Sequence, residues 1–387
     1  MTDTAYIVGA YEHPTRKATG KTIAQLHREV AAGALADAGL SLQDVDGLFA
    51  ASDAPGLGSL TMAEYLGIRP RFVDNTDTGG SAYVLAVGHA AQAIAAGKCS
   101  IALITLAGMP RSKIDLLIET SPFIDPLVPD VPYEQPFGGN LPNYYAMAAK
   151  RHMYAFGTTG EQLAWIKVAA SHHAQHNPHA MLPQLVSVAD VLASPMVADP
   201  LHRLDCCVVS DGGGAVIVAS AEVAKSLSRP LVRVRGSGEA VKHGNGGYPD
   251  LTYTAGLWSG RDAFAQAAVA PSDIKYASIY DSFTITVLMT LEDLGFCAKG
   301  EGGRFVADGK LISGVGRLPV NTDGGGLCNN HPANRGGITK VIEAVRQLRG
   351  EAHPAVQVRD CGLALAHGTG GSLGTRHGSA TVILERV

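Results

Sequence analysis

The chain has 387 residues, more than a single hydrophobic core usually holds, so two domains or a duplicated core are expected. Hydrophobic residues make up 46% of the sequence and charged residues 17%, as is typical of a globular protein with a large core. The net charge of -4, without a basic stripe, argues against nucleic acid as a partner. No uninterrupted apolar run reaches the ~18 residues of a membrane span.

Six cysteines are spread along the chain without the Cys-x-x-Cys pairing of zinc sites. Isolated thiols of this kind are usual in a reducing compartment, where disulfides are rare. The first residues lead directly into an apolar segment, without the basic and apolar regions of a signal peptide. We therefore expect a cytoplasmic protein that crosses no membrane.

The first part of the chain is predicted to alternate between short strands and helices. Apolar runs indicate strands at 5–10, 45–50, 72–73 and 101–106, and helical spacing of apolar residues indicates helices at 22–38, 62–66 and 81–96. The helix at 81–96 is rich in alanine and almost uncharged, so we expect it to be buried on all sides. With the strands on either side, it forms a βαβ-like unit.

The middle of the chain is predicted to depart from this alternation. Residues 109–141 are rich in proline and glycine and are interpreted as an inserted loop over the core. Two helices are expected at 143–154 and 159–176, followed at 206–218 by a strand, a glycine bend and a second strand. Four histidines lie at or just after the end of the second helix, at 172, 173, 176 and 179. No acidic residue stands at a ligand spacing nearby, so no metal site is predicted.

The last part of the chain repeats the pattern of strands and helices. Strands are expected at 230–236, 276–280 and 380–384, helices at 261–268, 284–294 and 338–348, and loops at 243–253 and 367–372. The loop at 243–253 is rich in glycine and contains Tyr248 and Tyr253. The sum of these elements predicts the α/β class.

An internal repeat relates the two parts of the chain. Residues 75–81, Asn-Thr-Asp-Thr-Gly-Gly-Ser, resemble residues 321–327, Asn-Thr-Asp-Gly-Gly-Gly-Leu. A second pair, at 34–40 and 263–269, occurs in the same order upstream. Two pairs in the same order predict two similar halves. We place these halves at 1–225 and 226–387, with the inserted loop region at about 109–200.

The stretch from Asn321 to Pro332 is the strongest candidate for a functional site. Three consecutive glycines let the backbone turn through positive φ or approach a ligand closely. His331 stands before a proline, which disfavours helical geometry at the histidine. A predicted helix begins just beyond, and a helix N-terminus favours negative charge. This arrangement is typical of a histidine that faces a ligand.

Several segments together resemble the thiolase superfamily along the whole chain. The likeness is closest to the branch grouped with sterol carrier protein and lipid-transfer proteins. The segments that carry it are 205–212, 280–284, 291–297, 321–325 and 331–332. The resemblance implies two αβαβα-type halves related by a pseudo-twofold. It also implies a homodimer or larger assembly, and acyl-CoA thioesters as substrates, with no further cofactor.

The resemblance places the nucleophilic cysteine of family thiolases at Gly80, with Ser81 adjacent. No cysteine occurs from Met1 to Lys98. Acyl-enzyme formation needs a thiolate, and serine has a far higher pKa with no base evident beside it. Ordinary thiolase turnover is therefore not expected.

Three further family motifs are implied at Tyr280, His331 and His367, the predicted catalytic residues. Tyr280 could donate a hydrogen bond to an enolate or, with a lowered pKa, act as acid or base. His331 could bind the thioester oxygen or act as a base, and His367 would take a polar role in place of a cysteine. Substrate contacts are predicted for these residues: Gly80, Ser81, Asp281, Gly325, Asn330, Gly370 and Tyr248, with Tyr253 as a further candidate.

A thiolase-like chain without these cysteines is similar to the retro-aldolases of side-chain degradation. Such enzymes cleave a carbon–carbon bond β to a CoA thioester and need a base and a hydrogen-bond donor, but no nucleophile. The resemblance implies a possible small zinc-ribbon/OB-fold partner subunit. An acyltransferase with thiolase-type Claisen chemistry and a non-catalytic acyl-CoA or lipid-binding module remain alternatives. Which residue is base and which is donor stays open.

Overall fold

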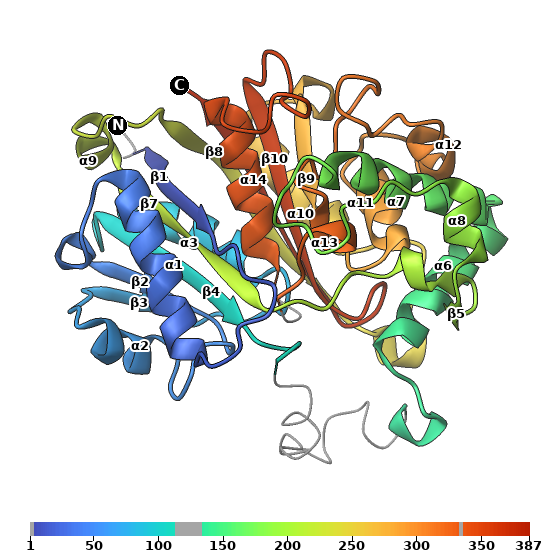
Figure 1. Ribbon diagram of the computed structural model, residues 1–387, viewed down its shortest axis with the longest axis horizontal. Coiled ribbons are helices and arrows are strands. Elements are labelled where there is room, and N and C mark those ends of the chain that lie inside the picture. Colours follow the sequence, from blue (N-terminus) through green and yellow to red (C-terminus); the bar gives the residue numbers. More distant parts are fainter. Residues whose placement is uncertain (1–3, 113–133, 333–335) are drawn as a thin grey trace.

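The computed structural model describes residues 4–112, 134–332 and 336–387. Most of the loop predicted at 109–141 therefore lies outside the described residues. Nine strands form one mixed sheet in the order β3-β2-β4-β7-β1-β8-β11-β10-β9 (Figure 1). Their bounds are β1 (Ala5–Glu12), β2 (Gly47–Phe49), β3 (Phe72–Asp74), β4 (Ile101–Gly108), β7 (Gly212–Ser220), β8 (Val232–Lys242), β9 (Tyr276–Ile279), β10 (Leu363–Gly371) and β11 (His377–Arg386). A separate hairpin joins β5 (Met196–Ala198) and β6 (Leu201–His202).

The pairing of the strands repeats from one half of the sheet to the other. In the first half β1 is antiparallel to β7, β7 is antiparallel to β4, and β4 is parallel to β2. In the second half β8, β11, β10 and β9 follow the same sequence of pairings. The halves meet where β1 pairs antiparallel with β8. The two predicted similar halves thus share one continuous sheet.

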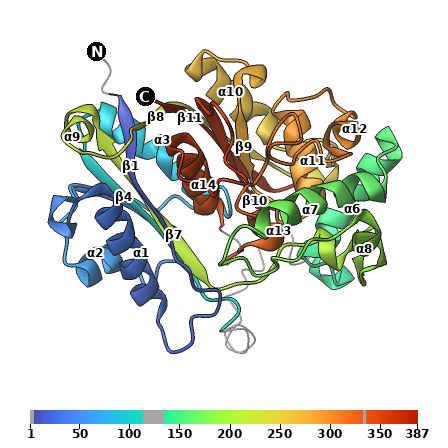
Figure 2. The same cartoon turned by 45° about the horizontal axis from the view of Figure 1, so that its top comes forward.

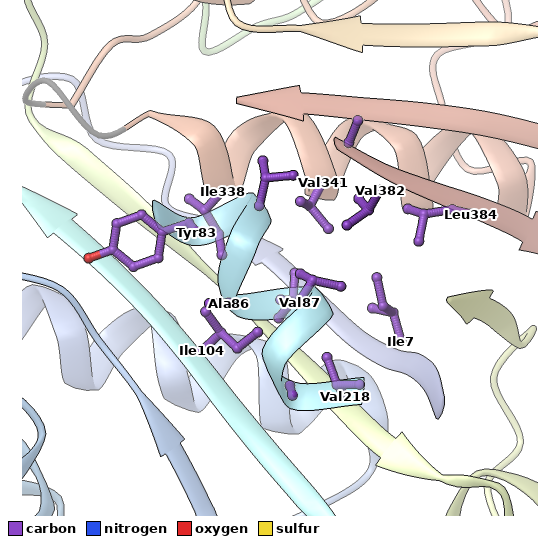
Figure 3. Close-up of a cluster of buried hydrophobic side chains, with 14 of the residues drawn as sticks. Ile7, Tyr83, Ala86, Val87, Ile104, Val218, Ile338, Val341, Val382 and Leu384 are labelled. Carbon is purple, nitrogen blue, oxygen red and sulfur yellow. The ribbon is translucent and has the colours of Figure 1, made fainter. Parts of the chain in front are cut away.

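Two helices fill the middle layer, α3 (Ala82–Ala95) and α14 (Gly337–Arg349). Their apolar side chains pack with strand residues of both halves in one cluster (Figure 3). The prediction that α3 is buried is confirmed for most of its length. The helix α14 is buried at every position except Arg346, so its polar side chains need partners inside the protein.

Helices form the two outer layers, each on the face of its half of the sheet that points away from the middle layer. Helices α1 (Ile23–Ala38) and α2 (Ser59–Leu66) pack on the first half, and α10 (Gly256–Ala267) packs on the second (Figure 2). Thr22 caps α1 with a capping box, and Gly39 ends the helix in the left-handed conformation. The layer order is the αβαβα arrangement that the resemblance implies.

The segment between β4 and β7 contributes helices that pack on the second half. Helices α6 (Leu141–Phe156) and α7 (Gly160–Ala174) share an apolar cluster with α11 (Thr284–Asp293), α12 (Gly302–Val306) and α13 (Gly325–Cys328). Figure 1 shows these green and orange helices side by side. In the described part of the chain the remaining helices are α8 (Val188–Ala193), α9 (Ala221–Lys225) and five 3-10 turns: η1 (Leu42–Asp44), η2 (Gln135–Phe137), η3 (Arg203–Asp205), η4 (Asn245–Gly247) and η5 (Pro271–Asp273). The predicted boundary at 225/226 falls between α9 and β8 and stays a prediction.

Two glycine-rich segments predicted as a bend or a loop are strands. Residues 212–214 begin β7, and residues 367–371 end β10. A side chain at Gly213 would overlap the backbone of β4, and one at Gly368 would come within 2.9 Å of the Ser81 Cα at the start of α3. Glycine in these strands permits close approach of a neighbouring backbone rather than a turn. In the described ranges no helix is long and apolar enough to cross a membrane.

Candidate active site

Tyr280 and His331 face each other inside the second half. Tyr280 directly follows β9, and its backbone N–H donates to the carbonyl of His367 at 3.0 Å. His331 follows α13, and its backbone N–H donates to Ser210 Oγ at 2.9 Å. The Tyr280 hydroxyl lies 2.9 Å from His331 Nε2, and the two rings meet edge to face at 5.4 Å. The structure therefore brings together two of the three predicted catalytic residues.

Burial keeps both members of this pair uncharged. Removal from water lowers the pKa of His331 to about 4, against a smaller opposing effect of Asp281. Burial raises the pKa of Tyr280 well above its ordinary value, and the neighbouring Cys207 adds to this shift. One of the predicted alternatives was a lowered pKa for Tyr280. That prediction is wrong, because the pKa is raised. A neutral imidazole beside a phenol can accept a proton while the phenol donates a hydrogen bond.

Gly80 borders this pair where β3 passes into α3. A side chain at this position would lie 2.7 Å from Cζ of Tyr280 and closer still to the carbonyl oxygen of Thr369. The second of these atoms belongs to the backbone, so it cannot move aside as a flexible side chain could. Position 80 therefore has no room for a nucleophilic side chain.

Ser81 is fully buried and points towards Thr78 rather than towards the pair. Its hydroxyl donates to the Thr78 carbonyl at 2.9 Å and lies 2.8 Å from the Thr78 hydroxyl. No histidine or carboxylate is among these partners. These contacts indicate that Ser81 closes the turn before α3.

Asp281 lies beneath the glycine loop, and its contacts indicate a structural role instead of the predicted substrate contact. Its carboxylate accepts the backbone N–H of Gly326 at 2.8 Å and of Leu327 at 3.1 Å. It also pairs with Lys340 Nζ of α14 at 2.7 Å, and both side chains are buried. Gly325 has a positive φ and no space for a side chain beside Asp281. This set of contacts fixes the loop that carries His331.

The other predicted substrate contacts are spread over different surroundings. Asn330 directs its side-chain amide to Glu12, and Gly370 packs against the backbone of Thr78 and Gly80. Tyr248 is 85% exposed at the end of η4. The ring of Tyr253 covers the ammonium group of Lys242 at 3.5 Å. Among the described contacts, none brings Tyr248 or Tyr253 to the Tyr280–His331 pair.

The catalytic prediction for His367 is wrong because its side chain lies on the other face of the sheet. Its Nδ1 lies 2.8 Å from the Thr381 hydroxyl and its Nε2 lies 3.2 Å from the Ser379 hydroxyl, under α10. Burial lowers the pKa of His367 to about 3. The next residue, Gly368, faces α3 instead. Because side chains alternate along a strand, an error of one residue reverses the face.

Three residues near the pair received no role from the sequence. Ser210 accepts the His331 amide, and the hydroxyl of buried Tyr145 donates to the Gly371 carbonyl at 3.2 Å. Cys207 donates its backbone N–H to the Ser282 carbonyl, and burial raises the pKa of its thiol to about 12. That thiol is therefore a poor nucleophile. Ser210 and Cys207 lie in segment 205–212, one of the segments that resemble the thiolase superfamily. That resemblance was the sequence signal that could have placed them near the site.

No group of three or more histidine, cysteine, aspartate or glutamate side chains is arranged to hold a metal ion in the described part of the chain. The histidines near the end of α7 have other surroundings. His173 is buried and contacts the backbone of Asn321 and Ser313. His176 stacks on His353 with ring centroids 5.0 Å apart.

Comparison with known proteins gives consistent matches. The family model "Thiolase C-terminal domain-like" matches residues 238–386. An acetyl-CoA acetyltransferase of Methanothermobacter thermautotrophicus is 36% identical over 90% of this chain and 91% of its own. A steroid side-chain-cleaving aldolase of Thermomonospora curvata is 36% identical over 89% of each chain. The solved structure "Ltp2-ChsH2(DUF35) aldolase" superposes with a TM-score of 0.87 at 33% identity, over 99% of this chain and 98% of that one.

Proposed function

The chain belongs to the thiolase superfamily, and on that premise we propose that it cleaves a carbon–carbon bond in β-hydroxyacyl-CoA thioesters by retro-aldol chemistry. The fold alone does not decide this, because acyltransferases and aldolases share it. The observation that supports the proposal is the hydrogen-bonded Tyr280–His331 pair beside a position 80 that has no room for a nucleophile. The reaction needs a base and a donor, and the pair offers both.

The proposed reaction begins when neutral His331 takes the proton of the β-hydroxyl group through Nε2. The Cα–Cβ bond then breaks, the β-carbon becomes the carbonyl carbon of a ketone or aldehyde, and the electron pair moves to the thioester as an enolate. The Tyr280 hydroxyl donates to the enolate oxygen. The imidazolium returns the proton to the α-carbon, which gives the shortened acyl-CoA. The thioester carbonyl itself accepts the electron pair, so this reaction requires no further cofactor.

The pKa directions favour this assignment over the reverse one. His331 is neutral at physiological pH, so Nε2 has a lone pair for the β-hydroxyl proton, whereas Tyr280 keeps its proton and can donate a hydrogen bond. In the free protein the two groups bond to each other. We propose that substrate replaces this bond by two, one from the β-hydroxyl to Nε2 and one from the phenol to the thioester oxygen.

An acyltransferase is the second candidate, because an acetyl-CoA acetyltransferase is among the similar proteins. It would need a nucleophile, and the two candidate groups, Ser81 beside position 80 and Cys207 near Tyr280, are unsuited. Ser81 is bonded to Thr78, and the Cys207 thiol has a raised pKa. The third candidate, a binding module without catalysis, would leave the Tyr280–His331 pair without a chemical role.

The decisive experiment incubates the intact protein with acyl-CoA and β-hydroxyacyl-CoA thioesters and records protein mass and small-molecule products together. Retro-aldol chemistry predicts a ketone or aldehyde, a shortened acyl-CoA and unchanged protein mass. A covalent acyl adduct would instead establish the acyltransferase. If the thioesters stay intact and the protein mass is unchanged, the incubation is repeated with a candidate partner subunit. The same result in its presence would favour the binding module.

We also propose that the chain forms homodimers and works with a small partner subunit. Strand β3 lies at the edge of the sheet, where Val73 is 50% exposed, and nearby Leu57 and Leu60 are 72% and 65% exposed. An open edge beside apolar side chains favours association. The partner proposal rests on the similar solved aldolase, which is named together with a DUF35 component. Light scattering of the chain alone and with a DUF35 protein tests both.

A further inference from the structure

Glu12, the last residue of β1, reaches across from the first half to the loop that carries His331. Its side chain is 8% exposed. One carboxylate oxygen accepts from Arg16 Nη2 at 2.6 Å, from Asn329 Nδ2 at 3.2 Å and from Asn330 Nδ2. The other oxygen pairs with Arg346 of α14 at 3.4 Å. The two residues just before His331 therefore share one acceptor in the other half.

In the described ranges, few other contacts hold these two side chains. Asn329 also reaches Asp323 at 3.0 Å and accepts from Arg16 at 2.8 Å. Among the residues that the structure describes, Glu12 is the one hydrogen-bond partner of the Asn330 side chain. Because one peptide bond joins Asn330 to His331, rotation at Asn330 would move the imidazole. The 2.9 Å contact between His331 and Tyr280 leaves little tolerance for such movement.

Burial makes these two side chains depend on protein partners. Asn329 and Asn330 are 0% and 4% exposed, so their amide groups need hydrogen bonds inside the protein. Glu12 also borders a cavity of about 250 Å³ between the halves, which Asp323, Glu343 and Arg346 line as well. Hydrogen bonds to a charged carboxylate are stronger than neutral ones. Four such donors converge on Glu12, from Arg16, Asn329, Asn330 and Arg346.

We propose that Glu12 is a positioning residue for His331: by holding Asn329 and Asn330, it sets the distance between the imidazole and the Tyr280 hydroxyl. The base of one half is thus aligned by a carboxylate of the other. This inference rests on the proposed function. It adds a residue that does not contact the Tyr280–His331 pair to the groups that determine the rate.

The first test replaces the carboxylate by an amide of equal size, Glu12→Gln. We expect kcat to fall between 10-fold and 100-fold while KM stays within twofold, since the substrate contacts remain. Nitrogen NMR of labelled histidine should show an altered His331 Nε2 signal. The control is Glu29→Gln, which removes a nearby carboxylate that pairs with His13 and Lys21 instead. It should change neither readout.

A pair swap keeps the proposal testable if Glu12→Gln unfolds. Asn330→Asp alone places two carboxylates together and should be the least active variant. Glu12→Gln with Asn330→Asp restores a bond of reversed polarity, and we expect at least tenfold recovery over Asn330→Asp. A double variant whose loss is only the product of the two single losses would overturn the proposal, as would an unchanged His331 signal in Glu12→Gln. If the wild type cleaves nothing, the proposed function fails, whereas the NMR comparison still tests the positioning.

Discussion

Two buried side chains with opposed pKa shifts give the site its chemical character. His331 is easily kept neutral and Tyr280 is hard to ionise, because both are removed from water. We predict that Tyr280→Phe lowers kcat between about 100-fold and 1000-fold, the usual cost of one lost oxyanion donor. Binding of a CoA thioester, measured by calorimetry, should stay within a few-fold. The matched control Tyr276→Phe removes a buried hydroxyl of β9 that contacts Thr322 instead. Equal losses of binding and rate would indicate a structural tyrosine.

Gly80 is required by its neighbours, so we predict that a cysteine substituted at this position does not act as a nucleophile. The Gly80→Cys side chain would overlap the Thr369 carbonyl and the Tyr280 ring. We predict no acyl adduct in intact-mass measurements and a loss of roughly 1–3 kcal/mol in stability, as for other overpacked sites. Gly80→Ala should destabilise similarly, because the overlap begins at Cβ. Acylation of Gly80→Cys at normal stability would contradict this account.

At the scale of helices and strands, the sequence predicted the structure correctly where a family-like motif or an internal repeat was present. The repeat of 75–81 and 321–327 correctly predicted two similar halves, since each copy connects a strand-like segment to a buried helix. The pair of Tyr280 and His331 followed from family-like motifs. The catalytic prediction for His367 was wrong because the sequence did not fix the strand register, and a shift of one residue moves a side chain to the other face of the sheet. The bend and loop predicted at the glycines 212–214 and 368–370 were wrong for a related reason. Glycine is needed both where a chain turns and where a neighbouring backbone comes close, so its presence does not distinguish the two.

Helix α14 is linked to the loop of α13 through Asp281, which forms a buried ion pair with Lys340 and accepts backbone N–H groups of that loop. The ion pair also escaped prediction because its partners are 59 residues apart. Lys340→Met would remove the cationic partner of the buried Asp281 carboxylate and leave it the backbone donors of Gly326 and Leu327. We predict a loss of about 3–5 kcal/mol in unfolding free energy, as for other broken buried pairs. The double variant with Asp281→Asn should recover part of this loss. Chemical denaturation measures both, and additive losses would mean that the pair is not coupled.

At the scale of the whole molecule, the continuous sheet makes one site from both halves. Tyr280 and His331 belong to the second half, whereas Gly80, Ser210 and Glu12 belong to the first. The two middle helices begin beside each other at this point, since Gly337 of α14 packs on the Gly80 carbonyl. Separation of the halves would therefore abolish the site rather than weaken it.

The same compact arrangement buries several histidines in the neutral form, and this has a consequence for stability. Burial lowers the pKa of His173 and His331 to about 4 and of His367 and His377 to about 3. In the unfolded chain these groups take up protons below a pKa of about 6.5. The unfolded state thus binds more protons between these values, so stability is full above pH 6.5 and falls as the pH decreases towards 4.

We predict that His367→Gln, whose amide can still bond to Ser379 and Thr381, reduces this acid dependence. The slope of unfolding free energy against pH should become shallower by up to about 1.4 kcal/mol per pH unit. Denaturant unfolding between pH 7 and pH 4.5 measures the slope for both proteins. Replacing the exposed His179 by Gln should leave it unchanged. Parallel curves for wild type and His367→Gln would mean that His367 is protonated in the folded state as readily as in the unfolded one.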